Sequence, residues 1–475
     1  MRLYFFWIFV FTFSAIQVLS QNEIENTVRQ LLKDPDYRNA SIGILVKDLD
    51  SGAIIYSLDQ EKVLIPASTM KLVTSASALE ILGGDYRFST KMGYKGRIDK
   101  NGGLKGDLVL IGGADPALGS EYFTEHYSGF LENWAKQVRL AGIERVEGDL
   151  ILDGSIFDSE KIPVTWIWED IGNYYGAGPS AFTVYDNLFR ITFRSDRNAG
   201  KPTEIIAVYP KIEGMEISNE VLSADNNCDN AYVFGSPLDK IRTVRGTIPK
   251  NRNSFTIKAA IHQPDEVLAK DFLQALAKEG VFVTGTIRYE NVDPKRINAI
   301  FEQYSPTLEE IAKVLNYESV NLFAEHFLKQ IGAEILGEGS RPKAIEVIRD
   351  FWDSKGISSE YLFMEDGSGL SHFNLVSPKF FTDMLSFMAA NQSFVNSLPG
   401  AGEGTLSMFD KELFPGNTLK AKSGSMTRVR CYSGYLKTDS GKTVVFSVMV
   451  NHFSGTHSKL IGEIEKLLLT IKTKN

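Results

Sequence analysis

The sequence predicts a mixed α/β (α+β) fold in which one antiparallel sheet, flanked by helices, is interrupted by a large, mostly β insertion. Two observations carry this prediction. A hairpin-and-helix pattern occurs at each end of the chain, and short strand-like runs separated by turn residues fill the middle, roughly residues 92–295. The simplest assembly places both hairpins in one sheet covered by helices. The 475 residues suffice for two or three domains with a large core.

The first hairpin is predicted from apolar runs at 42–48 and 53–57, which the turn residues Asp50-Ser51-Gly52 separate. A helix is expected next, over 68–82, because Pro66 precedes it, apolar residues form one face, and Gly83-Gly84 can end it.

The second hairpin is predicted from apolar-rich strands at 430–437 and 443–451 around Asp439-Ser440-Gly441. A closing helix over 458–470 carries an apolar stripe. Packing of this stripe on the sheet is the common outcome, and a role at a membrane surface is the alternative. In the middle, one helix is expected over 267–279, and strands are expected at 107–111, 149–152, 188–193, 204–209 and 254–261.

The N-terminus has the order of a secretory signal peptide: a basic residue at Arg2, an apolar run from Tyr4 to Leu19, then small and polar residues. Cleavage is expected near Ser20, and an uncleaved anchor is the alternative. The chain is therefore expected to be exported, to the periplasm or the cell-wall space, without a transmembrane helix after cleavage.

Composition excludes several function classes. The balance of 51 basic against 59 acidic residues argues against a nucleic-acid partner. The six histidines form no H-E-x-x-H pair or close ligand cluster, and no glycine-rich phosphate loop is present, so no metal or cofactor is expected. Cys228 and Cys431 are expected to be separate thiols.

Three short motifs carry the chemistry. The first is S-x-x-K, Ser68 to Lys71. At i and i+3 on a helix the amine comes within reach of the hydroxyl, which needs a base to become a nucleophile. Lys71 can be that base only if its pKa falls; burial and nearby positive charge both lower a lysine pKa, and Lys422 could supply the charge. The backbone N–H of Ser68, at the start of a helix, can bind an oxyanion.

The second motif is Ser319-Val320-Asn321 and the third is Lys422-Ser423-Gly424, followed by Ser425. Ser319 can relay a proton to the leaving amine, and Asn321 can hold Lys71 or a substrate amide. Lys422 supplies positive charge, while the hydroxyls of Ser423 and Ser425 can bind a substrate carboxylate. Gly424 permits close backbone approach, and the Ser425 N–H is the expected second oxyanion donor.

Each motif alone is weakly specific. Ser340-Arg341-Pro342-Lys343 repeats S-x-x-K, but Pro342 marks the start of a helix and no strand hairpin precedes it. Tyr185-Asp186-Asn187 is a rival for the second motif. Accidental matches by capping or turn serines are the alternative for any one motif, but not for all three in this order.

The trio is a signature of penicillin-binding proteins and β-lactamases. The chain resembles the class C low-molecular-mass penicillin-binding proteins, the D-alanyl-D-alanine carboxypeptidase/endopeptidase family. The resemblance covers nearly all of the mature chain and extends to Val376-Ser377-Pro378, Ser433-Gly434-Tyr435, and the stretches at 366–371 and 398–406. Ser423 stands where threonine is commoner, which keeps the hydroxyl.

The resemblance implies a penicillin-binding transpeptidase-like (β-lactamase-like) domain, residues 21–91 and 296–475, with two nested accessory domains. These are domain II, residues 92–191 and 267–295, and domain III, residues 192–266. It implies catalysis by Ser68, Lys71, Ser319, Asn321 and Lys422. The expected partners are peptidoglycan stem peptides ending in D-Ala-D-Ala, and β-lactam antibiotics as covalent inhibitors.

The family also places an acidic residue where it meets the free amine of the stem peptide's diamino acid. Asp153, at the end of a predicted strand, is the candidate, and a turn cap before Gly154 is its alternative role. Two other functions stay open. A β-lactamase on the same scaffold would need a water-activating group, but no E-x-x-L-N segment is present; a non-catalytic penicillin-binding or sensor protein would not need the intact trio.

Overall fold

The computed structural model describes residues 22–474, and the chain within it divides into two compact units. Unit 1 comprises the chain up to Ile81, Ala312–Val320 and Ile345 to the C-terminus; unit 2 comprises Leu82–Ile311 and Asn321–Ala344. The predicted signal peptide lies outside the described residues. The division into two nested accessory domains stays a prediction.

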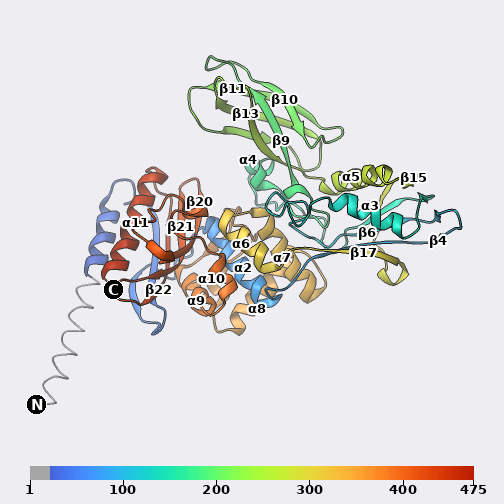
Figure 1. Ribbon diagram of the computed structural model, residues 1–475. Helices are drawn as coiled ribbons and strands as arrows, with labels where there is room; N and C mark the ends of the chain where they lie inside the picture. The colour runs from blue at the N-terminus through green and yellow to red at the C-terminus, as the bar shows by residue number, and fades with distance from the viewer. Residues whose placement is uncertain (1–21, 475) are drawn as a thin grey trace, which may run out of the picture. The chain divides into compact units, whose positions relative to one another are not determined.

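Unit 1 is built on a five-stranded antiparallel sheet in the order β2-β1-β22-β21-β20, which confirms the predicted sheet made from both ends of the chain (Figure 1). Its strands are β1 (Ser41–Asp48), β2 (Ile54–Leu58), β20 (Leu419–Met426), β21 (Val429–Lys437) and β22 (Thr443–Asn451).

Alternate side chains of a pleated strand point to opposite sides. Every residue of the central strand β22 after the first is buried, so both faces of this strand are covered. Val444, Phe446, Val448 and Val450 join an apolar cluster with α11 (His457–Lys474) and a helix at 22–33, so the closing helix packs on the sheet as predicted. Helix α9 (Pro378–Met388) packs against β1, β21 and β22, and its Leu385 carbonyl accepts from the Tyr435 hydroxyl at 2.7 Å.

The remaining helices of unit 1 position the site. The 3₁₀ turn η1 (Ala67–Thr69) leads into α2 (Met70–Ile81), whose residues Met70 to Leu79 are all buried. The predicted helix at 68–82 is therefore present, with a tighter first turn. Helix α10 (Gln392–Ser397) and a two-stranded ribbon, β18 (Leu362–Phe363) with β19 (Leu375–Val376), complete this part.

Unit 2 contains four small sheets, so the predicted mostly β insertion is present. One sheet has the order β16-β8-β6-β3-β17, from Ile287–Tyr289, Leu150–Asp153, Leu108–Ile111, Ser89–Tyr94 and Asn298–Tyr304. A second, β15-β7-β5-β4, comes from Phe282–Val283, Arg145–Val146, Gly103–Lys105 and Arg97–Ile98. Helices α3 (Phe130–Leu140) and α5 (Pro264–Lys278) pack together beside them (Figure 1).

The other two sheets of unit 2 are drawn together in green in Figure 1. They are β10-β9-β14 (Glu204–Tyr209, Leu188–Arg194, Phe255–Ala260) and β11-β13-β12 (Glu216–Ala224, Ile241–Pro249, Asn230–Phe234). Short helix α4 (Trp168–Ile171) and helix α7 (Asn321–Leu336) also belong to this unit, whereas α6 (Leu308–Glu318) and α8 (Arg341–Ser354) each run across a unit boundary.

Candidate active site

Ser68 lies on the 3₁₀ turn η1, between a strained backbone and a buried helix. Ala67 has φ +47°, a left-handed conformation that is costly for a residue with a Cβ. Thr69 closes the turn by donating its hydroxyl to the Pro66 carbonyl at 2.7 Å. Ile65, the residue before Pro66, is anchored by Asn451 of β22 through two hydrogen bonds of 2.8 and 3.1 Å. The turn therefore presents Ser68, which is half-buried, from a rigidly held backbone.

Lys71 is fully buried and reaches Ser68 directly, since its Nζ donates to Ser68 Oγ at 3.0 Å. The same amine donates to the Ser368 carbonyl at 2.6 Å. The amine and the hydroxyl predicted to share one helical face are thus in hydrogen-bond contact, which is the geometry that a general base requires.

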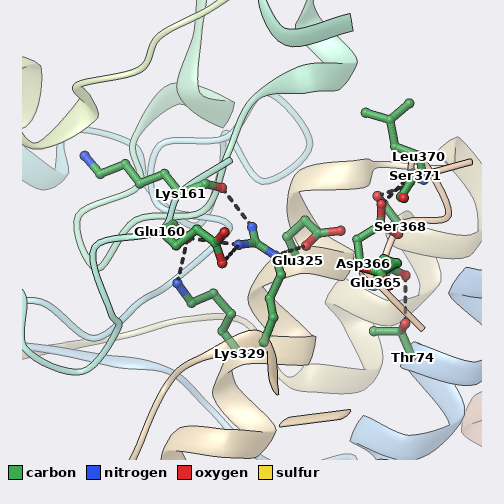
Figure 2. A network of polar contacts seen from close by, with 12 residues as sticks. Thr74, Glu160, Lys161, Glu325, Lys329, Glu365, Asp366, Ser368, Leu370 and Ser371 are labelled. Atoms are coloured by element: carbon green, nitrogen blue, oxygen red, sulfur yellow. Dashed lines mark hydrogen bonds and ion pairs between the residues drawn. The ribbon is translucent and has the colours of Figure 1, made fainter. Parts of the chain in front are cut away.

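The loop that supplies the Ser368 carbonyl is held by Asp366 (Figure 2). Asp366 Oδ1 accepts from the Gly369 N–H at 2.7 Å, and Oδ2 accepts from the Ser371 N–H at 2.6 Å. Thr74 of α2 ties the loop to the helix by donating to the Gly367 carbonyl at 2.7 Å. In the sequence this stretch is only part of a family resemblance; its function as a support for Lys71 depends on a backbone carbonyl, which no residue pattern reveals.

Strand β20, at the edge of the sheet, carries the third motif. Gly424 lies so close to the serine turn that a Cβ there would come within 2.3 Å of the Pro66 carbonyl oxygen and 3.1 Å of the Ser68 nitrogen. Lys422 and Gly424 share one face of β20, two residues apart. Glycine at 424 is therefore needed for the strand to approach the Ser68 backbone N–H.

Lys422 is fully buried and donates its Nζ to the Ser423 carbonyl at 2.9 Å. Burial, and then the positive charges of Lys71 and Arg430, hold the pKa of Lys422 well below its ordinary value of 10.5. The charges of the two motif lysines therefore interact, as predicted for a positive charge placed beside the S-x-x-K amine. Ser423 is buried, whereas Ser425 is exposed.

The second motif spans the boundary between the units. Ser319, in unit 1, directly follows the end of α6 with φ +61°, another left-handed residue that is not glycine. Three residues earlier, buried Asn316 donates to Ser75 of α2 at 3.1 Å and to Ser397 at 2.8 Å, so the end of α6 is fixed to the helix that follows Ser68. Strained residues held in this way cluster at functional sites.

Asn321 is the first residue of α7 and belongs to unit 2, where its side-chain amide donates to the Tyr175 carbonyl at 2.8 Å. The Tyr175 side chain in turn hydrogen-bonds Asp170, whose pKa burial raises to about 6. Sequence reasoning missed Tyr175 and Asp170, because nothing in their spacing connects them with residue 321.

Helix α7 is anchored by charged side chains within unit 2 (Figure 2). Lys329 is fully buried and contacts Asp158 at 2.6 Å, and buried Arg341 contacts Glu325 at 3.1 Å. Arg341 also donates to the Glu160 and Lys161 carbonyls at 2.9 and 2.8 Å. Breaking one partner of such a buried pair is costly, so these contacts fix the helix that begins with Asn321.

Asp153 ends β8 and lines a cavity of about 460 Å³ in unit 2. Its Oδ1 accepts from the Ser155 N–H at 2.9 Å and its Oδ2 from the Val292 N–H at 2.8 Å, and the residue is only 3% exposed. The contact with Ser155 is the turn cap that was its alternative role. Substrate binding by Asp153 stays a prediction.

The segment that competes with the second motif, Tyr185–Asn187, and the two cysteines also have defined places in the structure. Asn187 of the Tyr185–Asn187 segment is fully buried, and its amide bonds the Val184 N–H, the Gly178 carbonyl and the Thr183 hydroxyl, which is a structural use of the side chain. Cys228 is exposed and Cys431 buried, and neither is in a disulfide, as predicted. No group of three metal-ligating side chains occurs within residues 22–474.

A serine hydroxyl bonded to a buried lysine amine, beside a second lysine on an edge strand, defines a serine acyl-transfer site of the penicillin-binding type. The chain belongs to the D-Ala-D-Ala carboxypeptidase 3 (S13) family, which it matches over residues 24–468. It is a low-molecular-mass penicillin-binding protein and a serine-type D-alanyl-D-alanine carboxypeptidase.

Individual relatives agree. The chain is 30% identical to the D-alanyl-D-alanine carboxypeptidase of Actinomadura sp. (strain R39) over 451 residues, which cover 91% of this chain and 82% of the relative. It is 25% identical to the D-alanyl-D-alanine carboxypeptidase DacB of Haemophilus influenzae over 430 residues, covering 87% and 86%. The crystal structure of penicillin binding protein 4 from H. influenzae superposes with a TM-score of 0.80 at 23% identity, covering 94% of this chain and 98% of that one, so the fold is the same.

Within the described part of the chain, no helix is both long and apolar enough to cross a lipid bilayer.

Proposed function

We propose that this carboxypeptidase acts on peptidoglycan stem peptides ending in D-Ala-D-Ala through an acyl-enzyme on Ser68. The observation that carries the proposal is the 3.0 Å hydrogen bond between Lys71 Nζ and Ser68 Oγ. In it a buried amine contacts a half-exposed hydroxyl, so the base is shielded while the nucleophile is accessible.

In acylation, Ser68 Oγ attacks the carbonyl carbon between the two D-alanines and its proton passes to Lys71, which must be neutral at that moment. The oxyanion of the tetrahedral intermediate accepts hydrogen bonds from the Ser68 and Ser425 N–H groups. The tight fit of Gly424 against the Ser68 turn supports this pairing of donors. When the C–N bond breaks, the leaving D-alanine amine receives a proton relayed by Ser319.

In deacylation, water attacks the ester carbonyl, Ser68 Oγ leaves and regains a proton, and the shortened peptide is released. Lys71 and Ser319 move protons in this step, while Asn321 holds the substrate amide. A β-lactam follows the acylation step and forms the same ester bond, with ring opening in place of loss of an amine. The H. influenzae homologue has been crystallised in complex with a β-lactam.

Lys422 and the hydroxyls of Ser423 and Ser425 are assigned to the terminal carboxylate of the substrate. The burial of Lys422 supports this role, because an ammonium shielded from water attracts a carboxylate more strongly than an exposed one.

The free amine of the stem peptide's diamino acid has two candidate carboxylates. Asp153 faces a cavity, but both of its oxygens already accept backbone N–H groups. Asp170 is connected to Asn321 through Tyr175, and its pKa is raised toward neutrality, so a substrate ammonium would stabilise its charged form. We keep Asp153 as the sequence-based assignment and propose Asp170 as its competitor.

Endopeptidase cleavage of cross-linked peptides would use the same acyl-enzyme, with a larger leaving group. A β-lactamase activity or a non-catalytic sensor function would each use the same fold, but no observation favours either. The signal-peptide pattern of residues 1–20 supports export to the periplasm or the cell-wall space.

The deciding experiment is incubation with a fluorescent penicillin, followed by mass mapping of the adduct, together with measurement of D-alanine release from a D-Ala-D-Ala peptide. A stable adduct on Ser68 and D-alanine release support the proposal. An adduct elsewhere, or rapid turnover of the penicillin with no D-alanine release, contradicts it.

A further inference from the structure

A small cavity of about 20 Å³ lies in unit 2 where strand β13 meets the segment before helix α5. Its lining includes Lys240, Arg242, His262 and Gln263. The lining contains no residue assigned above to catalysis or to substrate binding. The cavity is therefore a feature separate from the acyl-transfer chemistry.

Arg242 is 4% exposed, and one edge of its guanidinium faces no acceptor. Its hydrogen bonds to the described residues all leave from Nη1, to the carbonyls of Ser236, Asp239 and Ile241 at 3.3, 2.9 and 2.9 Å. The carboxylate of Asp239 lies on that same side, 3.6 Å from Nη1, and is half-exposed. Nε has no hydrogen-bond partner within residues 22–474. The Nε–Nη2 edge of the fork therefore remains for a ligand.

His262 is 7% exposed, and neither ring nitrogen has a hydrogen-bond partner among the described residues. Burial, followed by the positive charges of Arg242 and Lys161, lowers the pKa of the His262 imidazole to about 3. The ring is thus neutral, with one N–H to donate, in a positive potential. Buried donors without acceptors are costly, so two such side chains at one cavity suggest that an acceptor belongs there.

The chemistry of the missing acceptor follows from the donors. The Nε–Nη2 edge of an arginine matches the two oxygens of a carboxylate. A cavity of about 20 Å³ has room for roughly one atom of water size, so it can admit one oxygen of a planar carboxylate, whereas a tetrahedral phosphate is too bulky. Gln263, the N-cap of α5, makes no side-chain capping bond. The N-terminus of this helix adds a favourable dipole for an anion, since the two carboxylates of its first turn, Asp265 and Glu266, are paired with Lys161 and Lys240.

We propose that the Arg242–His262 cavity binds a single carboxylate group, from a free small acid or amino acid or from the end of a peptide. Lys240 is paired with Glu266 at 3.0 Å, so the guanidinium and the imidazole supply the recognition. The proposal is independent of the acyl-enzyme mechanism and survives or fails without it.

The test is NMR of the full chain with ¹⁵N-labelled histidine, which gives a simple spectrum because the sequence has only six histidines. His262→Gln assigns the His262 ring signals. Acetate, D-alanine, N-acetyl-D-alanine and inorganic phosphate are titrated separately, with sodium chloride at matched ionic strength as the reference. The expected result is a saturable shift of the His262 signals by acetate, and the two alanine probes show whether the amino group of a free amino acid is tolerated.

Arg242→Lys keeps the charge but removes the fork, and it should weaken acetate binding roughly tenfold or more, the value of one charge-assisted hydrogen bond. Arg245→Lys is the matched control, since Arg245 is on the same strand, exposed, and paired with Glu220 at 2.7 Å. Penicillin labelling of all variants reports whether they fold. If Arg242→Lys does not fold, the wild-type titration decides alone: no saturable shift, the same shift with chloride, or a shift with phosphate but no carboxylate overturns the proposal. An Arg242→Lys variant that folds and binds acetate as tightly as the wild type also overturns the proposal.

Discussion

The chain contains S-x-x-K twice, and the two copies have opposite environments. Ser68 lies on a 3₁₀ turn after strained Ala67, half-exposed, and accepts from Lys71 at 3.0 Å. Ser340 is 5% exposed just before helix α8, and its hydroxyl donates to Glu338 at 2.8 Å. The same four-residue pattern thus makes a lysine–serine hydrogen bond in one place and a helix-start contact in the other.

The difference lies in what surrounds the pattern. Around Ser68, the Asp366 loop provides a carbonyl for the lysine, and Gly424 allows β20 to approach the serine backbone. Around Ser340, the next residue, Arg341, is committed to ion pairs with Glu160 and with buried Glu325, and the second pair joins α8 to α7. A serine and a lysine at positions i and i+3 are necessary for the acyl transfer, but the loop and the strand that flank them determine whether the serine can react.

The largest expected effect separates the two serines. Ser68→Ala removes the nucleophile, and D-alanine release should fall by roughly 10⁶-fold, the scale seen when a catalytic serine is deleted. Fluorescent-penicillin labelling should vanish while the circular dichroism spectrum is unchanged. Ser340→Ala is the matched variant and should label normally. Labelling that persists in Ser68→Ala but is lost in Ser340→Ala would mean that the two copies have been assigned in the wrong order.

The lysines give the second contrast. Lys71→Arg should slow acylation by roughly 10²–10⁴-fold, because general-base help is lost and a guanidinium stays protonated. Lys343→Arg, in the other copy, should leave the acylation rate within about twofold, since Lys343 has no part in the proposed proton transfer and a substitution that keeps the charge of such a residue has small effects. Stopped-flow acylation by a chromogenic β-lactam measures both. Near wild-type acylation by Lys71→Arg would remove the base assignment.

Much of this comparison could be predicted from the sequence, and the limits have physical causes. The hairpins and the closing helix were predictable because their apolar periods and turn residues are local. Ser68, Lys71 and Lys422 could be predicted as site residues because their proposed chemistry requires particular residue types at short spacings. The Ser368 carbonyl could not be found, because every residue has a carbonyl. Asp170 was missed because its connection with Asn321 through Tyr175 depends on the tertiary fold.

A glycine pair tests whether the Asp366 loop matters. A Cβ at Gly369 would lie 1.9 Å from the Ala67 carbonyl oxygen, beside the serine turn, and φ there is +82°. Gly369→Ala should therefore displace the Ser68 turn or the Ser368 carbonyl that Lys71 contacts, at a cost of roughly 10²-fold in kcat/KM for about 1 Å of misplacement. Gly356, with φ +77° and nothing within 4 Å, is the matched control for backbone strain. If Gly356→Ala loses as much activity as Gly369→Ala, strain and not the contact is responsible.

Lys422 should affect peptides more than esters. Lys422→Ala should reduce kcat/KM for a D-Ala-D-Ala peptide by roughly 10–100-fold, the loss of about one or two charge-assisted contacts, with a milder loss for a small ester without a carboxylate. In the wild type, the peptide-to-ester ratio should fall as pH rises through the pKa of Lys422, because the ammonium loses its charge. Since that pKa lies well below 10.5, the fall should begin well below pH 10.5. Equal losses on the two substrates would remove the carboxylate assignment.

The smallest expected effect concerns the recognition of the diamino acid, where two carboxylates compete. Asp153→Asn and Asp170→Asn are each assayed on two peptides, one with a free side-chain amine and one with that amine acetylated. A residue that binds the amine should, when changed, reduce kcat/KM about tenfold on the first peptide alone, the loss of one charge-assisted hydrogen bond.

Because Asp153 already accepts two backbone N–H groups, Asp153→Asn also replaces an acceptor by a donor at a buried turn and should lower the melting temperature. Melting curves therefore separate the two roles. A lower melting temperature with equal losses on both peptides makes Asp153 a turn residue, and an amine-specific loss in Asp170→Asn then assigns recognition to Asp170. An amine-specific loss in Asp153→Asn, with none in Asp170→Asn, returns the role to Asp153, and equal effects of both variants on both peptides exclude each of them.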